Sequence, residues 1–347
     1  MRSFLAAIAY VHLPTLGRML VLNLAHRPHW RRILFTLVFL TLHLAVTLLV
    51  FAGRLLDELL LPFHRRVAIR QPIFIISNPR SGTTLLHRLL CLDEDRFSYP
   101  LLYHTILPSA SLILLIRGIG WLERPLGRPL HRLFNRLDGL LFRGWAHIHP
   151  MGFNQSEEDE GLFTATFLTP AIYLLCPFPE QMPAALHLPG RLPPRVQQAL
   201  MAYYIGSLKR IMFATGGGGR IFLSKNVMTT GRFQMLLAAF PEARIVYITR
   251  TPLKAVPSFI SMFSTPWRLH SPDLRPDGPQ YQAIGHIILD FYRYFHDQKD
   301  RLPPEQFLWV RYEDLINDPL ALIERIYAHF GLSLSPRFRA RWVAEVR

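Results

Sequence analysis

Four short apolar runs stand out in the hydrophobic pattern of this chain, and each is followed at once by polar or basic residues. They are Ile73–Ile76, Ile221–Leu223, Ile245–Ile248 and Phe307–Val310. Runs of this length, rich in β-branched and aromatic residues, predict buried strands. A much longer apolar run near the amino terminus, at 33–52, contains no formally charged residue. The pattern therefore predicts strands that carry chemistry at their ends and one separate hydrophobic segment.

The first strand is predicted to enter a helix through a polar loop. Leucines at 85, 86, 89 and 90 repeat at the spacing of a helix face. The first amides of a helix lack partners and carry the positive end of its dipole, so they bind phosphate groups well. Gly82 allows close approach of the backbone, Arg80 adds a charge, and Ser81, Thr83 and Thr84 add hydroxyl donors.

Two later strands also deliver basic residues to their carboxyl ends. Lys225 follows the run at 221–223, and Arg250 follows the run at 245–248, with Ser258 eight residues further on. A nucleoside triphosphatase would have a lysine after the loop glycine and a magnesium-binding aspartate at the second strand. Both signals are missing from these positions, which argues against a kinase or an ATPase.

These segments resemble sulfotransferases that use 3'-phosphoadenosine-5'-phosphosulfate (PAPS), particularly the bacterial and Golgi-type branch. The resemblance rests on Pro79–Thr84, on Lys225, on the spacing of Arg250 and Ser258, and on Arg311–Leu315 followed by Asp318 and Pro319. These matches occur in the same order as in the family. They cover roughly residues 69 to 336.

The resemblance implies a fold and a cofactor site. The fold is α/β, a P-loop-like three-layer sandwich with a central parallel sheet and helices on both faces, and the ligand lies at the carboxyl ends of the strands. Residues 80–84 (Arg80, Ser81, Gly82, Thr83 and Thr84) would bind the 5'-phosphosulfate, and Arg250 with Ser258 the 3'-phosphate. Arg80 and Lys225 would stabilise charge on the leaving phosphate. No metal is expected; His147 and His149 lack nearby cysteine partners.

The general base is less clear from the sequence. Related enzymes often carry an aromatic-Glu pair where this chain has Tyr103-His104, and an imidazole can accept a proton at neutral pH. Many relatives also place a histidine shortly after the residue matching Lys225, but here the stretch is 226–230 without histidine. Glu158 and Glu160 are further candidates, and the alternative is that this acidic run caps a helix.

Residues 1–68 are predicted to form a hydrophobic, membrane-associated region that precedes a sulfotransferase domain at 69–347. The candidate span 33–52 is long enough to cross a bilayer, and the alternative is a helix packed monotopically against the domain. Basic residues flank the run on both sides, so its orientation cannot be read. Related enzymes often continue beyond the position of Arg347, and the resemblance leaves open whether this domain is complete.

The composition limits the classes of ligand and partner that are expected. The chain has 39 basic and 24 acidic residues and a net charge of +15, which favours anionic ligands and anionic lipid. Nucleic acid is not expected, because no nucleic-acid motif accompanies the arginines. The two cysteines require no oxidising compartment. We expect a bacterial inner-membrane association with the domain in the cytoplasm, or a Golgi membrane in a eukaryote.

The predicted function is transfer of a sulfuryl group from PAPS to a hydroxyl of a lipophilic acceptor, such as a lipid, quinol or glycolipid. The apolar segments 107–115 and 163–178, with the hydrophobic run, suggest the lipophilic character. The alternatives are a nucleotide-dependent phosphotransferase and an inactive membrane-bound member of the fold. The oligomeric state is not predicted.

Overall fold

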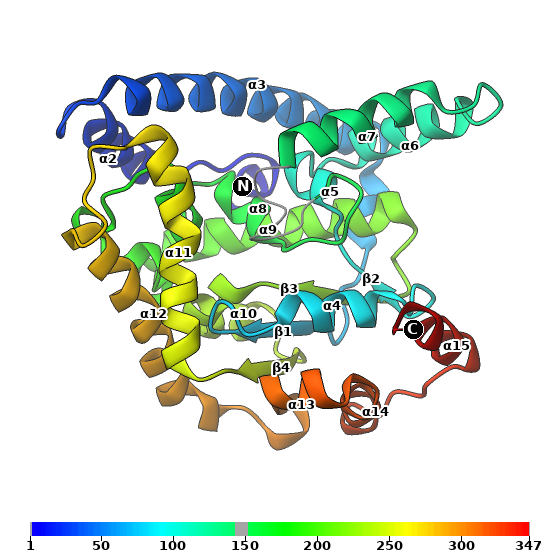
Figure 1. The fold of residues 1–347 in the computed structure, drawn as a ribbon. Helices are drawn as coiled ribbons and strands as arrows, with labels where there is room; N and C mark the ends of the chain where they lie inside the picture. Colours follow the sequence, from blue (N-terminus) through cyan, green and yellow to red (C-terminus); the bar gives the residue numbers. More distant parts are fainter. Residues whose placement is uncertain (1, 143–151, 347) are drawn as a thin grey trace.

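The computed structural model describes residues 2–142 and 152–346. At its centre is a parallel sheet with the strand order β2-β3-β1-β4-β5 (Figure 1). The strands are β1 (Ile73–Ser77), β2 (Phe97–Ser98), β3 (Ile221–Lys225), β4 (Arg244–Thr249) and β5 (Phe307–Arg311). Four of them contain the predicted runs; the short edge strand β2 was not predicted.

Helices connect and cover these strands. The amino-terminal helices are α1 (Arg2–Ile8), α2 (Leu13–Leu24) and α3 (Trp30–Leu60). Those between β1 and β3 are α4 (Thr83–Cys91), α5 (Leu102–Ile106), α6 (Ala110–Leu122), α7 (Pro129–Phe142), α8 (Glu160–Thr164) and α9 (Pro194–Thr215). The remaining helices are α10 (Phe233–Ala239), α11 (Pro252–His270), α12 (Pro279–Gln298), α13 (Tyr312–Asn317), α14 (Pro319–His329) and α15 (Pro336–Val346).

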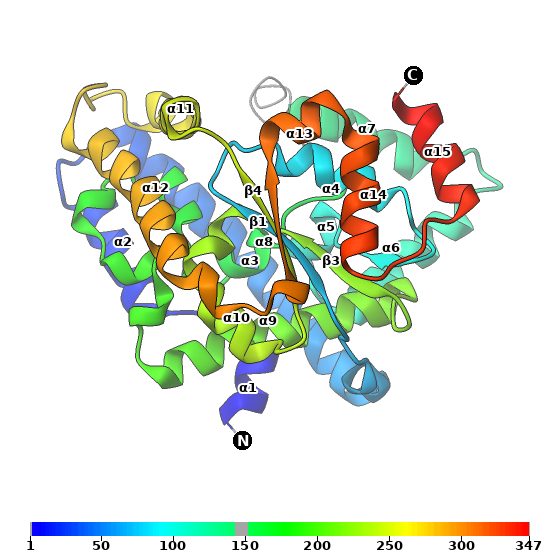
Figure 2. The same ribbon diagram turned by 90° about the horizontal axis from the view of Figure 1, so that it is seen from below.

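The central strand β1 supplies both hydrophobic cores, which explains why its sequence is continuously apolar. Phe74 and Ile76 pack into a core shared with α9, α10, α11 and α12. Ile73 and Ile75 point to the opposite face and pack with α4, α14 and α15. Figure 2 shows these two helical layers on either side of the sheet. The predicted three-layer α/β architecture is confirmed.

Helix α3 contains the predicted apolar segment and extends beyond it at both ends. Its most apolar stretch has a mean hydropathy of 2.5 with 11% of the residues buried, so it could cross a membrane by length and composition. At about 1.5 Å per residue its 31 residues extend about 46 Å. In the structure it lies across the top of the molecule in Figure 1.

Both ends of α3 are attached to the body of the protein. Near its start, Nη1 of the buried Arg32 lies 3.4 Å from Oδ1 of Asp273, in the loop between α11 and α12. Near its end, Arg54 donates from Nε to the carbonyl oxygen of Pro108 at 2.9 Å. Asp57 accepts from Nε of Arg210 on α9 at 3.1 Å. The helix therefore packs along the body, as in the monotopic alternative.

Candidate functional site

The loop between β1 and α4 has the backbone geometry of an anion-binding turn. Gly82 precedes α4 with a φ of +83°, and a Cβ there would lie 2.8 Å from the ring of Tyr312. Only glycine satisfies both conditions without strain. Arg80 also has a positive φ of +69°. Ser81 donates from Oγ to the carbonyl oxygen of Asn78 at 2.7 Å, which closes the turn.

The strand-end arginine lies beside this loop. Arg250 donates from Nη1 to the carbonyl oxygen of Arg80 at 2.8 Å, and Arg80 donates from Nε to Oγ of Ser258 at 3.0 Å. The guanidinium of Arg250 stacks over Tyr312, 4.4 Å from the ring centroid. Burial, together with the nearby charge of Arg250, lowers the pKa of Arg80. The structure thus brings together two cations and a hydroxyl that are far apart in the sequence.

Arg250 carries an unmet hydrogen-bonding group at this place. Its Nε is buried and has no hydrogen-bond partner among the described residues. Burying a donor on a charged group without a partner is costly, so the site is built to receive an acceptor. Two adjacent guanidinium groups favour an anion with more than one charge, and the phosphates of PAPS fit this chemistry.

Lys225 lies on the other side of the same loop. Its buried Nζ donates to Oγ1 of Thr84 at 3.1 Å and lies 3.1 Å from Oε1 of Glu158. A second carboxylate, Glu157, is 3.9 Å away. The parallel register that pairs Ile75 with Lys225 sets this position at the carboxyl edge of the sheet. A positive charge is therefore held directly against the first turn of α4.

A cavity of about 630 Å³ opens in front of these groups. The loop, the acidic segment and the end of β4 all contribute to its wall. Residues from the predicted site that line it are Arg80, Gly82, Thr83, Thr84, Glu158, Glu160 and Arg250. The remaining predicted residues are not part of the lining: Ser81 shapes the loop, Ser258 lies behind Arg80, and Lys225 lies behind Thr84.

Glu160 lines the cavity but has strong partners of its own. Arg232 donates to both of its carboxylate oxygens, at 2.7 and 2.8 Å, and Thr169 donates to one of them. Neither Glu160 nor Arg232 is as exposed as Glu158, whose side chain is 21% accessible. A carboxylate held in this way orients the wall of the cavity, and Glu158 is left as the more accessible carboxylate.

Asp159 and Arg232 were not identified from the sequence. Asp159 is fully buried and accepts hydrogen bonds from Oη of Tyr204, from Oγ of Ser224 at 2.8 Å and from Nδ2 of Asn226 at 2.7 Å. Burial raises the pKa of Asp159 to about 6. Its side chain makes no capping bond at the start of α8, and Glu160 occupies the first turn of that helix, where an acidic residue is favourable. Its signal was its position between the two glutamates already singled out.

His104 is placed differently from the other candidates. Its Nδ1 accepts the backbone N–H of Leu101 at 3.0 Å, and its Nε2 is buried without a partner among the described residues. Its neighbours Leu102 and Thr105 line the cavity, whereas His104 does not. Burial and the charge of Arg117 lower its pKa to about 3. This geometry favours a neutral imidazole that caps the start of α5.

Within the described ranges, no group of three or more His, Cys, Asp or Glu side chains could hold a metal ion. His147 and His149 lie outside the described residues. Cys91 and Cys176 are both buried and free.

Comparison with known proteins identifies the family. A model of the sulfotransferase family matches residues 72–336. The chain belongs to this family. It is 29% identical over 278 residues to the omega-hydroxy-beta-dihydromenaquinone-9 sulfotransferases Stf3 of Mycobacterium bovis and Mycobacterium tuberculosis. The match covers 78% of this chain and 66% of the length of each curated relative.

Solved structures agree on the fold. Sulfotransferase STF1 from Mycobacterium tuberculosis H37Rv matches with a TM-score of 0.66 and 23% identity, covering 96% of this chain and 86% of that chain. Sulfotransferase STF9 from Mycobacterium avium matches with a TM-score of 0.69 and 17% identity, covering 87% and 74%. These two likenesses show that the chain has the sulfotransferase fold.

Proposed function

We propose that this protein transfers a sulfuryl group from PAPS to a hydroxyl of a lipophilic acceptor, giving a sulfate ester and 3'-phosphoadenosine-5'-phosphate (PAP). The observation that carries the proposal is the cluster of Arg80, Arg250 and Ser258 beside the loop, with Nε of Arg250 buried and unpartnered. Such a cluster fits a ligand that has phosphates at two places. The site of a phosphotransferase would instead need an acidic residue where β4 ends in Arg250.

Two separate groups of residues would bind the two ends of PAPS. Arg250 and Ser258 would hold the 3'-phosphate, and the amides of residues 80–84 with the hydroxyls of Thr83 and Thr84 would hold the 5' end. PAPS supplies the sulfuryl group when it is bound. Lys225 would stabilise the negative charge that develops on the departing phosphate oxygen, because it is held against Thr84 without needing to move.

We propose that Glu158 is the general base that takes the proton of the acceptor hydroxyl. Its carboxylate lines the cavity, lies 3.1 Å from Nζ of Lys225 and is partly accessible. Glu160 is already held by Arg232, and the Nδ1 lone pair of His104 is used by a backbone N–H. In this assignment the hydroxyl proton passes to Glu158 while the acceptor oxygen bonds to sulfur and the bond from sulfur to the phosphate oxygen breaks.

Two observations support a lipophilic acceptor. The named activity of the Stf3 relatives concerns a menaquinone, which is a lipid. In addition, α3, α6 and α7 expose many large apolar side chains to the surroundings, including Leu34, Leu48, Leu115, Trp121 and Phe134. Exposed apolar surface on this scale marks a membrane contact or another interaction site. We therefore place the protein on a membrane surface, with α3 lying in the interface rather than crossing it.

The mycobacterial source of the relatives favours a bacterial inner membrane over a Golgi membrane, with the site on the cytoplasmic side where bacteria make PAPS. No nucleic-acid partner is part of this proposal. A domain boundary between 68 and 69 stays a prediction, because α1 and α3 pack on the same body as the rest of the chain.

The test is calorimetric titration of the full-length protein in nanodiscs with PAP and, separately, with ATP, without added magnesium. The expected result is binding of PAP with a clear preference over ATP. Transfer of radioactive sulfur from PAPS to a membrane alcohol such as geranylgeraniol is then measured in the same preparation. Binding of ATP in preference to PAP would favour the phosphotransferase, and PAP binding without transfer to any alcohol would favour an inactive member of the fold.

A further inference from the structure

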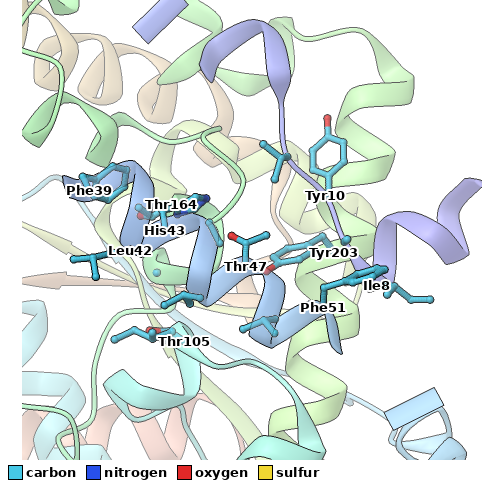
Figure 3. A pocket seen from close by; sticks show the side chains of 17 residues that line it. Ile8, Tyr10, Phe39, Leu42, His43, Thr47, Phe51, Thr105, Thr164 and Tyr203 are labelled. Carbon is cyan, nitrogen blue, oxygen red and sulfur yellow. The ribbon is translucent and has the colours of Figure 1, made fainter. Parts of the chain in front are cut away.

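A second cavity lies between α3 and the body of the protein. Its volume is about 330 Å³. The α3 side of its wall is formed by Phe39, Leu42, Val46, Val50 and Phe51, and the opposite side by Tyr203 and the segment after α1. Figure 3 shows the lining side chains, among them Phe39, Leu42 and Phe51 from α3. The lining is mainly apolar, so the cavity suits a hydrocarbon and not a nucleotide.

This cavity shares a wall with the cavity of about 630 Å³ at the candidate site, here called the sulfotransferase cavity. Thr105, Gly161 and Thr164 line both of them. All three are small, and a Cβ on Gly161 would lie 2.5 Å from Oγ1 of Thr105. The wall is therefore thin. Joining the two spaces would require movement of Thr105 and Thr164, whose Oγ1 atoms donate to the carbonyl oxygens of Leu102 at 2.8 Å and Glu160 at 3.0 Å.

The other end of the cavity reaches the apolar surface of α3. Leu42 and Phe51 line the cavity and are also 62% and 40% exposed. Around them α3 exposes further apolar side chains such as Leu44, Leu48 and Leu49. A molecule dissolved in the bilayer would thus meet the mouth of the cavity without passing through water.

One polar atom in this apolar space lacks a partner. His43 lines the cavity, stacks against Phe39 and approaches Phe167, with ring centroids 5.6 and 4.7 Å apart respectively. Its Nε2 is buried without a hydrogen-bond partner among the described residues. Thr164, in the wall shared with the sulfotransferase cavity, lines this space together with His43 (Figure 3). A polar group on a bound molecule would satisfy this nitrogen.

We propose that the cavity beneath α3 binds the hydrocarbon chain of the acceptor, which enters from the bilayer between Leu42 and Phe51. The acceptor's hydroxyl then passes Thr105, Gly161 and Thr164 to reach Glu158. This inference rests on the proposed sulfuryl transfer, and it adds the location of the lipid chain and its route of entry. It also gives α3 a role in substrate binding besides membrane attachment.

The experiment uses a geranylgeraniol derivative with a photoreactive diazirine near the end of its chain. The full-length protein in nanodiscs is irradiated with this probe, and the labelled peptides are identified by mass spectrometry. The expected result is labelling of the residues within 39–51 that line the cavity, and of Tyr203. We compare the variants Val46→Trp, which fills the cavity, and Leu48→Trp, which adds the same ring to the outer face of the same helix.

Val46→Trp is expected to reduce the cavity labelling about tenfold, because a few methylene groups lose their apolar contacts. Leu48→Trp should leave it unchanged. Labelling confined to exposed positions, or equally present in wild type and Val46→Trp, would overturn the proposal, because it would show only partition of the probe to the outer surface. The wild-type map decides this even if Val46→Trp fails to fold.

PAP titration of the same preparations separates the two proposals. Cavity labelling without PAP binding would retain the lipid site and refute the PAPS donor. PAP binding without cavity labelling would retain the donor site and refute the lipid site.

Discussion

Replacement of Arg250 by alanine is the sharpest test of the cofactor site. Arg250 uses Nη1 to hold the carbonyl oxygen of Arg80, and its buried Nε has no partner among the described residues. If this nitrogen binds the 3'-phosphate, the variant loses at least one hydrogen bond between charged groups. Such a bond contributes about 1.5–3 kcal/mol, so the dissociation constant for PAP should rise about 10- to 100-fold.

A matched ligand isolates the 3'-phosphate. AMP has the same base, sugar and 5'-phosphate as PAP and lacks only the group assigned to Arg250. We expect Arg250→Ala to change the affinity for AMP by less than about threefold, so the preference for PAP over AMP shrinks by nearly the whole effect. Calorimetric titration of wild type and variant with both nucleotides gives the required four values.

The contact between Arg250 and Arg80 makes this control necessary. Removing Arg250 also removes a bond to the carbonyl oxygen of a residue with positive φ, so the loop itself could shift. A shifted loop would weaken AMP and PAP alike. Equal losses for both nucleotides, or no loss for either, would therefore refute the assigned contact. Arg337→Ala, which removes a surface arginine paired with Asp95, controls for the change in net charge.

Further predictions concern turnover and stability. Lys225→Met should lower kcat for sulfuryl transfer about 100- to 1000-fold by removing the charge next to Thr84. The measurement is a stopped assay at saturating PAPS, and a loss of less than tenfold would contradict the role of Lys225. His104→Asn retains an acceptor for the N–H of Leu101 and should keep most of the turnover. If His104 were the general base, the same substitution would abolish nearly all of the turnover. The folded pKa of His104, about 3, is below the unfolded value, so its stabilising contribution is complete above pH 6.5 and falls as the pH drops toward 3. Denaturant titrations at several pH values should accordingly show that His104→Asn loses less unfolding free energy on acidification than the wild type does. The difference should be up to about 1.4 kcal/mol per pH unit. Asp57→Ala leaves Arg210 buried with one partner fewer and removes the acceptor of two first-turn N–H groups of α6, those of Ala110 and Ser111 at 2.9 and 2.6 Å. It should cost about 3–5 kcal/mol of unfolding free energy. The exposed Asp297→Ala is its control, and equal effects of the two would show that the cluster around Asp57 does not hold α3.

The strands and the loop between β1 and α4 could be predicted because their signals are local. A buried parallel strand must be apolar on both faces, so β1, β3 and β4 appear in the sequence as continuous runs. The edge strand β5 was also predicted to be buried, but Val310 is its one buried residue. The loop follows from Gly82 and its polar neighbours within a few residues of β1. Arg250 lies two residues before α11 and Ser258 lies within that helix, so their spacing was also visible in the sequence.

The acidic residues could not be assigned from the sequence, because their roles depend on partners far along the chain. Glu158, Asp159 and Glu160 are adjacent, yet they contact Lys225, Tyr204 and Arg232 respectively. The sequence shows four consecutive acidic residues at 157–160, and only the fold shows that Glu157, Glu158 and Glu160 line the cavity whereas Asp159 does not.

The same limit applies to α3, where hydropathy and contacts lead to different conclusions. Hydropathy is a sum over neighbouring residues, and by that sum α3 could cross a bilayer. The contacts that decide its placement involve polar residues near its two ends, Arg32 with Asp273 and Asp57 with Arg210. A helix that crossed the membrane would carry one of these ends about 30 Å away from the body. Both attachments exist in one structure, so α3 lies along the body of the protein, with the cavity of Figure 3 between the two.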